Sequence, residues 1–304
     1  MKSLATFHPF VLFLHYVLVI AITMFMLHPL ILLFSLLGSL LFFFMLAPSQ
    51  QFFKDIGFYI VVFLLIAITN PLFVHKGETI LFFLNDNPVT LEAIIYGFVI
   101  ATMLVAVIFW SKSYSELMTT DKLLYLFGKI IPKLALVLSM AFSFIPLFKL
   151  QIKKVHEAQK TLGLYTSNSF TERILSGIRV FNSMLTWSLE NSIQRADAMK
   201  ARGYGLPKRT SFSLFKIETR DMTVIVTLAA MFLLIIFAQV KQYFTFYYYP
   251  VISELTTVKS HVFYFVIVFL LMILPFIIEF KENIQWTLLK RKISVSPIPN
   301  KMKQ

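Results

Sequence analysis

The sequence predicts an all-α integral membrane protein with about six transmembrane helices and a cytoplasmic block that contains two long amphipathic helices. Three observations predict this fold class: high hydrophobicity, apolar runs of membrane length, and the placement of basic residues. The 304 residues are 58% hydrophobic and 14% charged, with a mean hydropathy of +0.77. Soluble proteins average about half apolar and a quarter charged residues. The composition is therefore that of a membrane protein.

Six apolar runs are long enough to cross the roughly 30 Å of a bilayer's hydrocarbon core. They cover residues 10–27, 29–46, 57–74, 91–110, 222–240 and 260–280. The first run follows a single basic residue, Lys2, and lacks a small-residue cleavage site. We therefore interpret it as a membrane helix and not as a cleaved signal.

A seventh apolar run, 130–148, has only fifteen residues between Lys133 and Lys149, and its length does not settle whether it crosses. The distribution of charge settles whether this run crosses the membrane, because cytoplasmic loops of membrane proteins collect Lys and Arg. Residues 149–221 hold thirteen basic and six acidic residues, a net of +7, and residues 281–304 hold six and one, a net of +5.

The connections at 75–90 and 241–259 are short and nearly neutral, as expected on the outer side. All these assignments agree if 130–148 does not cross, with both termini in the cytoplasm. We therefore expect a four-helix membrane bundle at 1–110, a cytoplasmic or interfacial block at 111–221, and two further transmembrane helices with a basic tail at 222–304.

Within the cytoplasmic block, apolar residues recur at steps of three and four, the period of one helix face. They are Ile174, Ile178, Phe181, Leu185, Leu189, Ile193, Ala196 and Met199. The pattern predicts two amphipathic helices, about 133–162 and 171–202, lying across or beneath the bilayer. Each ends at a glycine, Gly163 or Gly203, where a left-handed C-cap costs least. On spacing alone, ordinary termination and a functional helix end are equally good explanations.

Several kinds of chemistry have no basis in this sequence. The absence of cysteine excludes disulfides, thiolate nucleophiles and Cys-ligated metals. None of the nine glycines lies in a GxxxxGK[ST] frame, so any ATP hydrolysis belongs to another chain. The six histidines lack a spacing that would bring two metal ligands onto one helix face. We expect this chain to bind no metal or cofactor.

The predicted spans contain almost no ionisable residue: Glu92 and Glu279 stand at span ends, and His15 lies well inside. Proton- or ion-coupled carriers place such groups at mid-membrane, so an independent secondary transporter is disfavoured. His15 could make a functional contact, but we favour a structural role, in which it hydrogen-bonds a neighbouring helix or faces a small polar gap. The net charge of +13 indicates orientation in a lipid bilayer and not nucleic-acid binding.

A series of short motifs follows in order over about 150 residues. The motifs are Asn70-Pro71-Leu72-Phe73 with His75 and Gly77, Thr90-Leu91-Glu92-Ala93 with Tyr96-Gly97, Phe144-Ile145-Pro146, the segments 157–163 and 196–204, Arg209-Thr210, and Arg220-Asp221-Met222. This series resembles the transmembrane T component of energy-coupling-factor (ECF) transporters, the CbiQ-like family also known from cobalt uptake. The helices before Asn70 match only as generic apolar segments.

The resemblance implies a non-catalytic scaffold in the bacterial cell membrane. Such a scaffold links two cytoplasmic ATP-binding cassette ATPases to a separate small membrane protein that binds a vitamin or metal for uptake. ATP and Mg²⁺ would bind on the ATPase chains. In this family two coupling helices cross beneath the membrane, and each ends in an Ala-Arg-Gly signature whose arginine enters a groove on one ATPase.

The second signature is present here with Arg202 as the docking cation, but the first departs from the pattern because Leu162 replaces its arginine. A leucine cannot make a charge-assisted contact, so this end would dock through apolar contact or through the point charge of Lys160. Docking is then asymmetric on two different ATPases, or one anchor is degenerate. The residues expected at the ATPases are Ala201, Arg202, Gly203, Lys160, Thr161, Leu162 and Gly163, and those expected to support the helices are Glu157, Gln159 and Met199.

Two other classes of function compete with this interpretation. An integral membrane enzyme acting on a lipid-linked substrate would need catalytic carboxylates, histidines or clustered arginines facing one cavity. An ATP-driven permease with its own substrate path would need polar groups inside the spans. The sequence offers neither pattern.

Overall fold

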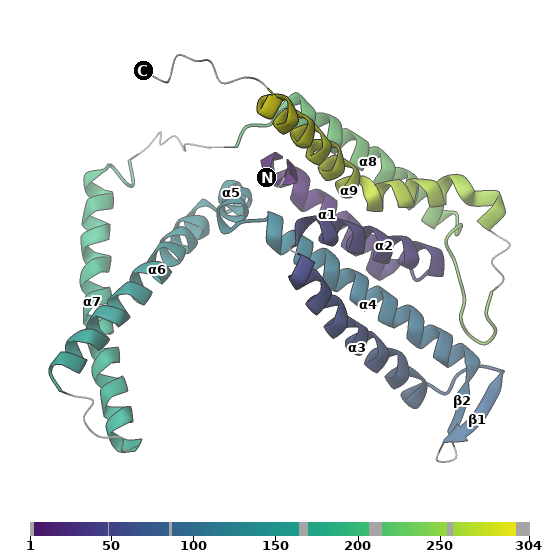
Figure 1. Ribbon diagram of the computed structural model, residues 1–304, viewed down its shortest axis with the longest axis horizontal. Coiled ribbons are helices and arrows are strands. Elements are labelled where there is room, and N and C mark those ends of the chain that lie inside the picture. The colour runs from purple at the N-terminus through teal and green to yellow at the C-terminus, as the bar shows by residue number, and fades with distance from the viewer. Residues whose placement is uncertain are drawn as a thin grey trace. The chain divides into compact units, whose positions relative to one another are not determined.

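The computed structural model describes residues 3–47, 49–84, 87–163, 170–206, 215–253 and 258–295. These residues form a nearly all-helical protein with one short β-hairpin, which confirms the predicted fold class apart from the hairpin (Figure 1). The chain divides into two compact units, one of residues 1–122 and 215–304 and one of residues 123–214. The sidedness of both units, and the assignment of 111–221 to one cytoplasmic block, stay predictions.

The first unit holds seven helices among the described residues, and the hairpin connects two of them. Its elements are η1 (Ser3–Thr6), α1 (Pro9–Phe25), α2 (Pro29–Leu46), α3 (Ser49–Phe73), β1 (Ile80–Leu84), β2 (Asn87–Thr90), α4 (Leu91–Leu117), α8 (Thr219–Val240) and α9 (Val258–Val295). The second unit holds α6 (Pro132–Thr161) and α7 (Phe170–Ala201), and α5 (Thr120–Ile130) begins in the first unit and continues into the second.

Six described helices are long and apolar enough to cross a membrane, and five of them correspond to predicted runs. They are α2, α3, α4, α6, α8 and α9. Helix α1 has 17 residues and falls just short of the required length, whereas α6, which contains the doubtful run 130–148, meets it. Length and composition alone do not place α6 across a bilayer, so its location stays a prediction.

Helix α2 lies in the core of the first unit, where α4 and α9 pack against it. Close approach to α9 requires a glycine, because a Cβ on Gly38 would stand 2.9 Å from the carbonyl oxygen of Met272. Gly97 on α4 likewise faces the carbonyl oxygen of Ala67 on α3, where a Cβ would come within 2.6 Å. Small residues at such contacts are typical of packed membrane helices.

A polar network lies inside this core. The indole of Trp110 on α4 donates to the Ser35 hydroxyl on α2 at 3.0 Å, and the Thr23 hydroxyl on α1 lies 2.7 Å from the same oxygen. All three residues are fully buried. Because lipid offers no competing partners, such interhelical hydrogen bonds help to fix which helices pair.

An ion pair joins α3 and α4 where sequence reasoning placed none. The Lys112 ammonium lies 2.8 Å from the Asp55 carboxylate and 4.8 Å from the centre of the Tyr59 ring. The predicted spans began at 57 and ended at 110, so both charges fell outside them, whereas α3 begins at Ser49 and α4 ends at Leu117.

The connection at 75–90, predicted as a plain outer loop, is instead organised by a hairpin and by Glu92. This carboxylate accepts hydrogen bonds from the Thr79 backbone and hydroxyl, the latter at 2.7 Å. Gly77 has φ +137°, which strains any residue with a Cβ, and a Cβ there would lie 2.5 Å from the Glu92 carboxylate, so this turn favours glycine. Asn70 donates to the carbonyl of Ala93 at 3.0 Å. The motif residues between 70 and 97 thus converge on one end of α3 and α4.

The N-terminal segment is tied to α8 and α9 by two buried carboxylates. The backbone N–H of Leu4 donates to Glu279 at 3.0 Å, and that of His8 donates to Asp221 at 3.3 Å. The Arg220 guanidinium lies 4.1 Å from the centre of the Phe7 ring. This gives Arg220 and Asp221 a structural role that sequence reasoning did not assign.

Candidate functional site

Two long helices of the second unit carry the residues predicted to act. Helix α6 spans 30 residues and α7 spans 32, which corresponds to lengths of about 45 and 48 Å. Their bounds confirm the predicted helices at 133–162 and 171–202 within one residue. Figure 1 shows the two helices crossing, with their C-terminal ends pointing away from the crossing in different directions.

The crossing is held by Arg195 of α7. Its guanidinium donates to the Ser143 hydroxyl of α6 at 2.8 Å and lies 4.2 Å from the centre of the Phe144 ring. A second contact sets the rings of Phe148 and Trp187 edge to face at 5.7 Å. Hydrogen bonding, cation–π attraction and ring packing together oppose sliding of one helix along the other. Sequence reasoning listed Phe144 within a motif but did not assign this role to it or to Arg195.

The C-terminal end of α7 is a complete Schellman motif. Gly203 adopts φ +81°, its N–H donates to the Lys200 carbonyl at 2.9 Å, and the Tyr204 N–H donates to the Met199 carbonyl at 3.0 Å. The predicted left-handed glycine is confirmed at this position. Because the chain turns sharply there, Arg202 stands exposed at the helix terminus, where the carbonyl dipoles favour a cation.

The C-terminal end of α6 has the same backbone turn with a different side chain. Gly163 adopts φ +71° and donates to the Lys160 carbonyl at 3.1 Å, which confirms the second predicted left-handed glycine. The side chain at the equivalent position is Leu162, which is 74% exposed. Thr161 turns its hydroxyl back to the Ala158 carbonyl at 2.8 Å. The α6 end thus presents an apolar group where the α7 end presents a cation.

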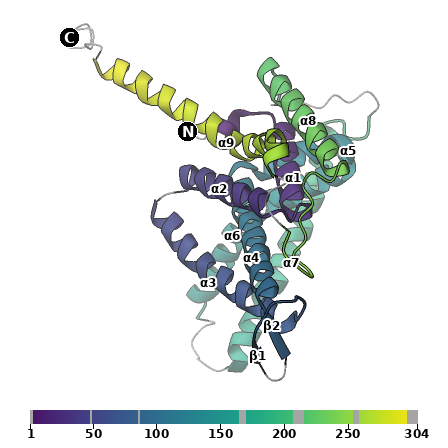
Figure 2. The same cartoon turned by 90° about the vertical axis from the view of Figure 1, so that its right-hand side faces the viewer.

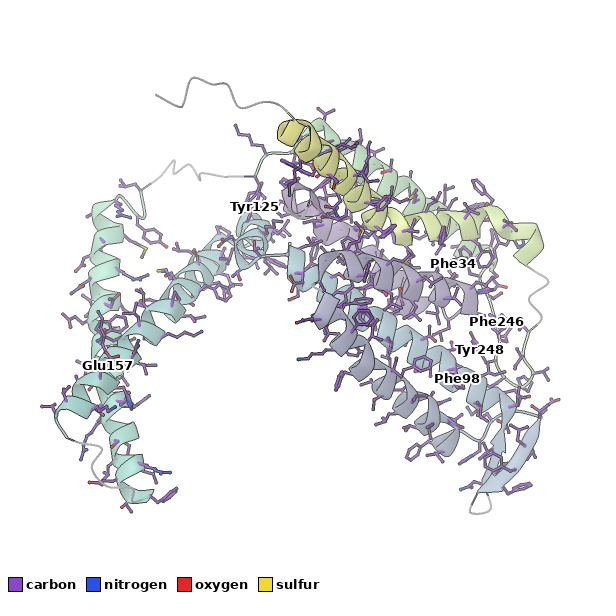
Figure 3. The ribbon with its side chains drawn as sticks, viewed as in Figure 1. Phe34, Phe98, Tyr125, Glu157, Phe246 and Tyr248 are labelled. Atoms are coloured by element: carbon purple, nitrogen blue, oxygen red, sulfur yellow. The ribbon has the colours of Figure 1, made fainter. Side chains whose placement is uncertain are left out.

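The three residues expected to support these helices have different surroundings. Gln159 is buried, Met199 is half-buried, and Glu157 is exposed on α6, where Figure 3 labels it. Glu157 pairs with Lys153 one turn earlier at 3.9 Å. Exposed pairs at this spacing contribute little, so Glu157 affects helix stability only slightly. The roles of all three, and of the two helix ends, stay predictions.

The predicted apolar stripe of α7 is largely uncovered by the described residues. Its exposed fractions are 48% for Ile174, 50% for Ile178, 64% for Phe181, 46% for Leu185, 58% for Leu189 and 64% for Ile193. Ala196 and Met199, nearest the C-terminal end, are half-buried. A contiguous apolar surface of this kind marks a site for a protein partner or a membrane.

Side chains of the types that bind metal ions are dispersed in the described parts of the chain. These parts contain no group of three or more His, Asp or Glu side chains close enough to hold an ion. Arg220 and Asp221 lie at the start of α8 in the first unit. Arg209 and Thr210 lie outside the described residues.

Comparison with known proteins identifies the family. The family described as cobalt transport protein, CbiQ, matches residues 3–213, more than half of the chain. The chain belongs to the CbiQ family. The match covers the first four helices, α5, the crossing pair and both glycine-capped ends.

Individual relatives of this CbiQ-family chain are distant. It is 29% identical over 180 residues to an energy-coupling factor transporter transmembrane protein, EcfT, of Listeria innocua, covering 55% of this chain and 68% of that protein. It is 27% identical over 206 residues to EcfT of Staphylococcus aureus, covering 62% and 77%. An uncharacterized Mycoplasma pneumoniae protein is 28% identical over 173 residues, covering 53% of this chain and only 40% of that protein.

Proposed function

We propose that this CbiQ-family chain is the coupling subunit of an ECF-type importer for a vitamin or metal. It would link two cytoplasmic ATP-binding cassette ATPases to a separate small membrane protein that binds the substrate. ATP and Mg²⁺ would act on the ATPase chains, and both termini of this chain would lie in the cytoplasm. The observation that carries the proposal is the pair of crossed helices whose capped ends present Arg202 and Leu162 to solvent.

The geometry of the crossing supports transmission of force. Two helices of about 45 Å that are joined at Arg195, Ser143 and Phe144 move as a pair, because separating them would break a hydrogen bond and a cation–π contact together. When ATP draws two ATPases together, each would carry one helix end with it. The change in crossing angle would then be passed to whatever packs on the exposed stripe of α7.

The exposed stripe supports a membrane-embedded partner at this point. Six apolar side chains between Ile174 and Ile193 are about half exposed or more. A small substrate-binding membrane protein has the apolar surface that this stripe needs. The cargo would be chosen by that protein, so no substrate site is required here.

The two helix ends would dock differently. Arg202 offers a planar guanidinium that can make two parallel hydrogen bonds with a carboxylate, whereas Leu162 offers only apolar contact. We therefore propose a polar groove on one ATPase and an apolar one on the other, or weaker docking at the α6 end.

The test is copurification from native membranes with a tag on this chain. The expected result is recovery of two nucleotide-binding proteins and one small membrane protein. Arg202→Ala should lose at least one ATPase, whereas Lys200→Ala should retain both, because Lys200 is an equally exposed cation in the same helical turn but is not the predicted anchor. Leu162→Ala reports separately on the α6 end. Equal recovery with Arg202→Ala and Lys200→Ala, or a chain that is always recovered alone, would rule the proposal out.

Sidedness is tested by single-cysteine labelling, which is clean because the chain has no cysteine. Ser139 suits the purpose, since it is exposed, whereas Ser143 bonds to Arg195. Ser139→Cys and Lys160→Cys should react with a membrane-impermeant maleimide in inside-out vesicles and not in intact cells. Reaction from outside the cell would overturn the cytoplasmic placement of α6.

A further inference from the structure

The hairpin between α3 and α4 carries four consecutive apolar side chains that are mostly exposed. They belong to β1 and are 52% exposed for Ile80, 53% for Leu81, 52% for Phe82 and 67% for Phe83. Successive side chains of a strand point to opposite faces, so both faces of β1 carry apolar groups. A two-stranded sheet in water normally turns a polar face to the solvent. The composition of β1 therefore fits apolar surroundings on both sides.

The base of the hairpin is fixed to the first turn of α4. The Leu91 N–H donates to the Thr79 carbonyl at 3.0 Å, and the Thr79 hydroxyl donates to Glu92 at 2.7 Å. The Thr90 hydroxyl donates to the Lys76 carbonyl at 2.7 Å. Figure 2 shows the hairpin at the end of α3 and α4, both of which are long and apolar enough to cross a membrane. These contacts hold β1 close to the level at which α4 leaves the bilayer.

An apolar groove of about 310 Å³ lies between the hairpin, α3 and α4. Every side chain that lines it is apolar, and among them are Phe82 and Val89 of the hairpin, Ile68 of α3 and Phe98 of α4. Phe82 and Val89 are partners in the sheet, so the groove lies on their face of the hairpin, whereas Phe83 lies on the other face. Ligand sites occupy roughly 300 Å³ or more, so the groove has room for a hydrocarbon chain.

The groove opens onto an exposed side of α3. Ile68, which lines the groove, is 60% exposed, and Val61 and Leu65 on the same helix are each 63% exposed. Only 11% of the most apolar stretch of α3 is buried. A membrane-length helix that packs so little against its own chain faces lipid, and lipid tails are as apolar as leucine. The groove is therefore continuous with the bilayer, and an acyl chain can enter it directly.

The backbone of β1 limits how deep the hairpin can lie. Strand β2 pairs with one edge of β1, and the described residues place no strand along its other edge. Exposed sheet edges do not occur in the hydrocarbon layer, because lipid tails cannot satisfy N–H and C=O groups. At headgroup level, water and polar lipid groups satisfy such an edge, while apolar side chains reach the acyl chains. The strand is thus suited to the membrane interface and not to the membrane centre.

We propose that the hairpin is an interfacial membrane anchor: β1 lies at headgroup level with Phe83 among the lipids, and the groove behind Phe82 holds an acyl chain of a bilayer phospholipid. The anchor fixes the depth of the α3–α4 connection in the bilayer. It is independent of the proposed coupling function, because it uses only contacts within the first unit.

The first test measures the surroundings of β1 in the purified full chain, reconstituted in phospholipid nanodiscs. The chain has no cysteine, so Phe83→Cys gives a single site for a nitroxide spin label. Collision with oxygen reports lipid, and collision with a water-soluble nickel chelate reports water. We expect the label at 83 to favour oxygen, at a shallower depth than a label on Val61→Cys within α3, the lipid control. Lys76→Cys, exposed at the hairpin base, is the water control.

Two results of this measurement would overturn the proposal. A label at 83 that favours the nickel chelate as much as the label at 76 would place β1 in water. A label at 83 that neither reagent reaches would show that protein covers β1. Phe83 is largely exposed, so its replacement should leave the fold intact.

The second test addresses the groove. Ile68→Trp places a larger side chain at the groove, whereas Leu65→Trp makes the same kind of change at an exposed position of α3 that does not line it. Native mass spectrometry of the detergent-solubilised full chain counts the phospholipid molecules that it retains. We expect Ile68→Trp to retain several-fold less phospholipid than the unaltered chain, and Leu65→Trp to retain as much. Equal retention by the two variants, whether high or low, would overturn the assignment of an acyl chain to the groove.

Discussion

The two compact units of this chain differ in how much apolar core they bury. The first buries large side chains such as Trp110, Phe42 and Phe109 against its own helices. The second leaves Phe181, Leu189 and their neighbours on α7 exposed, where apolar residues recur at helical spacing. The first unit therefore has a buried core of its own beside exposed apolar side chains such as Phe25 and Phe73, whereas the second buries little of its apolar surface among the described residues.

The two units also differ in the polar contacts that join their helices. In the first unit, hydrogen bonds such as those of Ser35, Glu92 and Asp221 join elements that are far apart in sequence. In the second, the long-range polar contact that the structure describes between α6 and α7 runs from Arg195 to Ser143. With the Arg195–Phe144 and Phe148–Trp187 contacts, it lies at the crossing and resists sliding of one helix along the other.

The largest effect is expected for Trp110→Ala, which breaks the core of the first unit. Removing a fully buried tryptophan should cost about 3–5 kcal/mol in the free energy of unfolding. It also leaves the Ser35 hydroxyl without its indole donor. Chemical unfolding in detergent micelles measures the loss. A cost below that of an ordinary surface substitution would show that the first unit is not packed as described.

A smaller effect is expected for Gly203→Ala at the end of α7. Alanine in a left-handed conformation costs about 1–2 kcal/mol, so the last turn should fray. Hydrogen exchange of the backbone amides at Gly203 and Tyr204 measures this. Gly177 is the matched control within the same helix: its Cβ would meet open space, and Gly177→Ala should stabilise the helix by about 0.5–1 kcal/mol. Effects of the same sign at both positions would contradict the C-cap.

The smallest effect on the isolated chain is expected for Phe181→Ala. Phe181 is 64% exposed, so its truncation should change the free energy of unfolding by less than about 0.5 kcal/mol. The same variant should clearly reduce recovery of the small membrane partner, because it removes a ring from the exposed stripe. If Phe181→Ala were as destabilising as Trp110→Ala, the stripe would be buried within the chain and the contrast between the units would be lost.

Much of the candidate site was predictable because its signals are local. The three-and-four spacing of apolar residues marked α7, and Gly163 and Gly203 marked the ends of α6 and α7, where the structure has both in the left-handed conformation. The sequence alone also showed that Leu162 stands where the family signature has an arginine. What these ends bind is not encoded locally, so the ATPase-docking role of Arg202 stays a prediction.

The contacts that position the site were not predictable in the same way. Arg195 could have been read as one more solvated charge, and only the crossing of α6 and α7 places it over Phe144. Span ends were misplaced by several residues at Asp55 and Lys112, because hydropathy falls at the first charge although the helix continues. The hairpin at 80–90 was missed, since a short two-stranded element carries a weak signal beside long helices.

By itself, the sequence determined that the chain is a helical membrane protein, where its long amphipathic helices run and where they end, because composition, helical period and glycine conformation act within a few residues. Only the tertiary structure decided which helices pair, through Ser35 with Trp110, Asp55 with Lys112 and Arg195 with Ser143. In a membrane helix both the lipid-facing and the buried side are apolar, so hydrophobicity does not distinguish them. Partners separated by tens of residues become visible only when the helices are packed together.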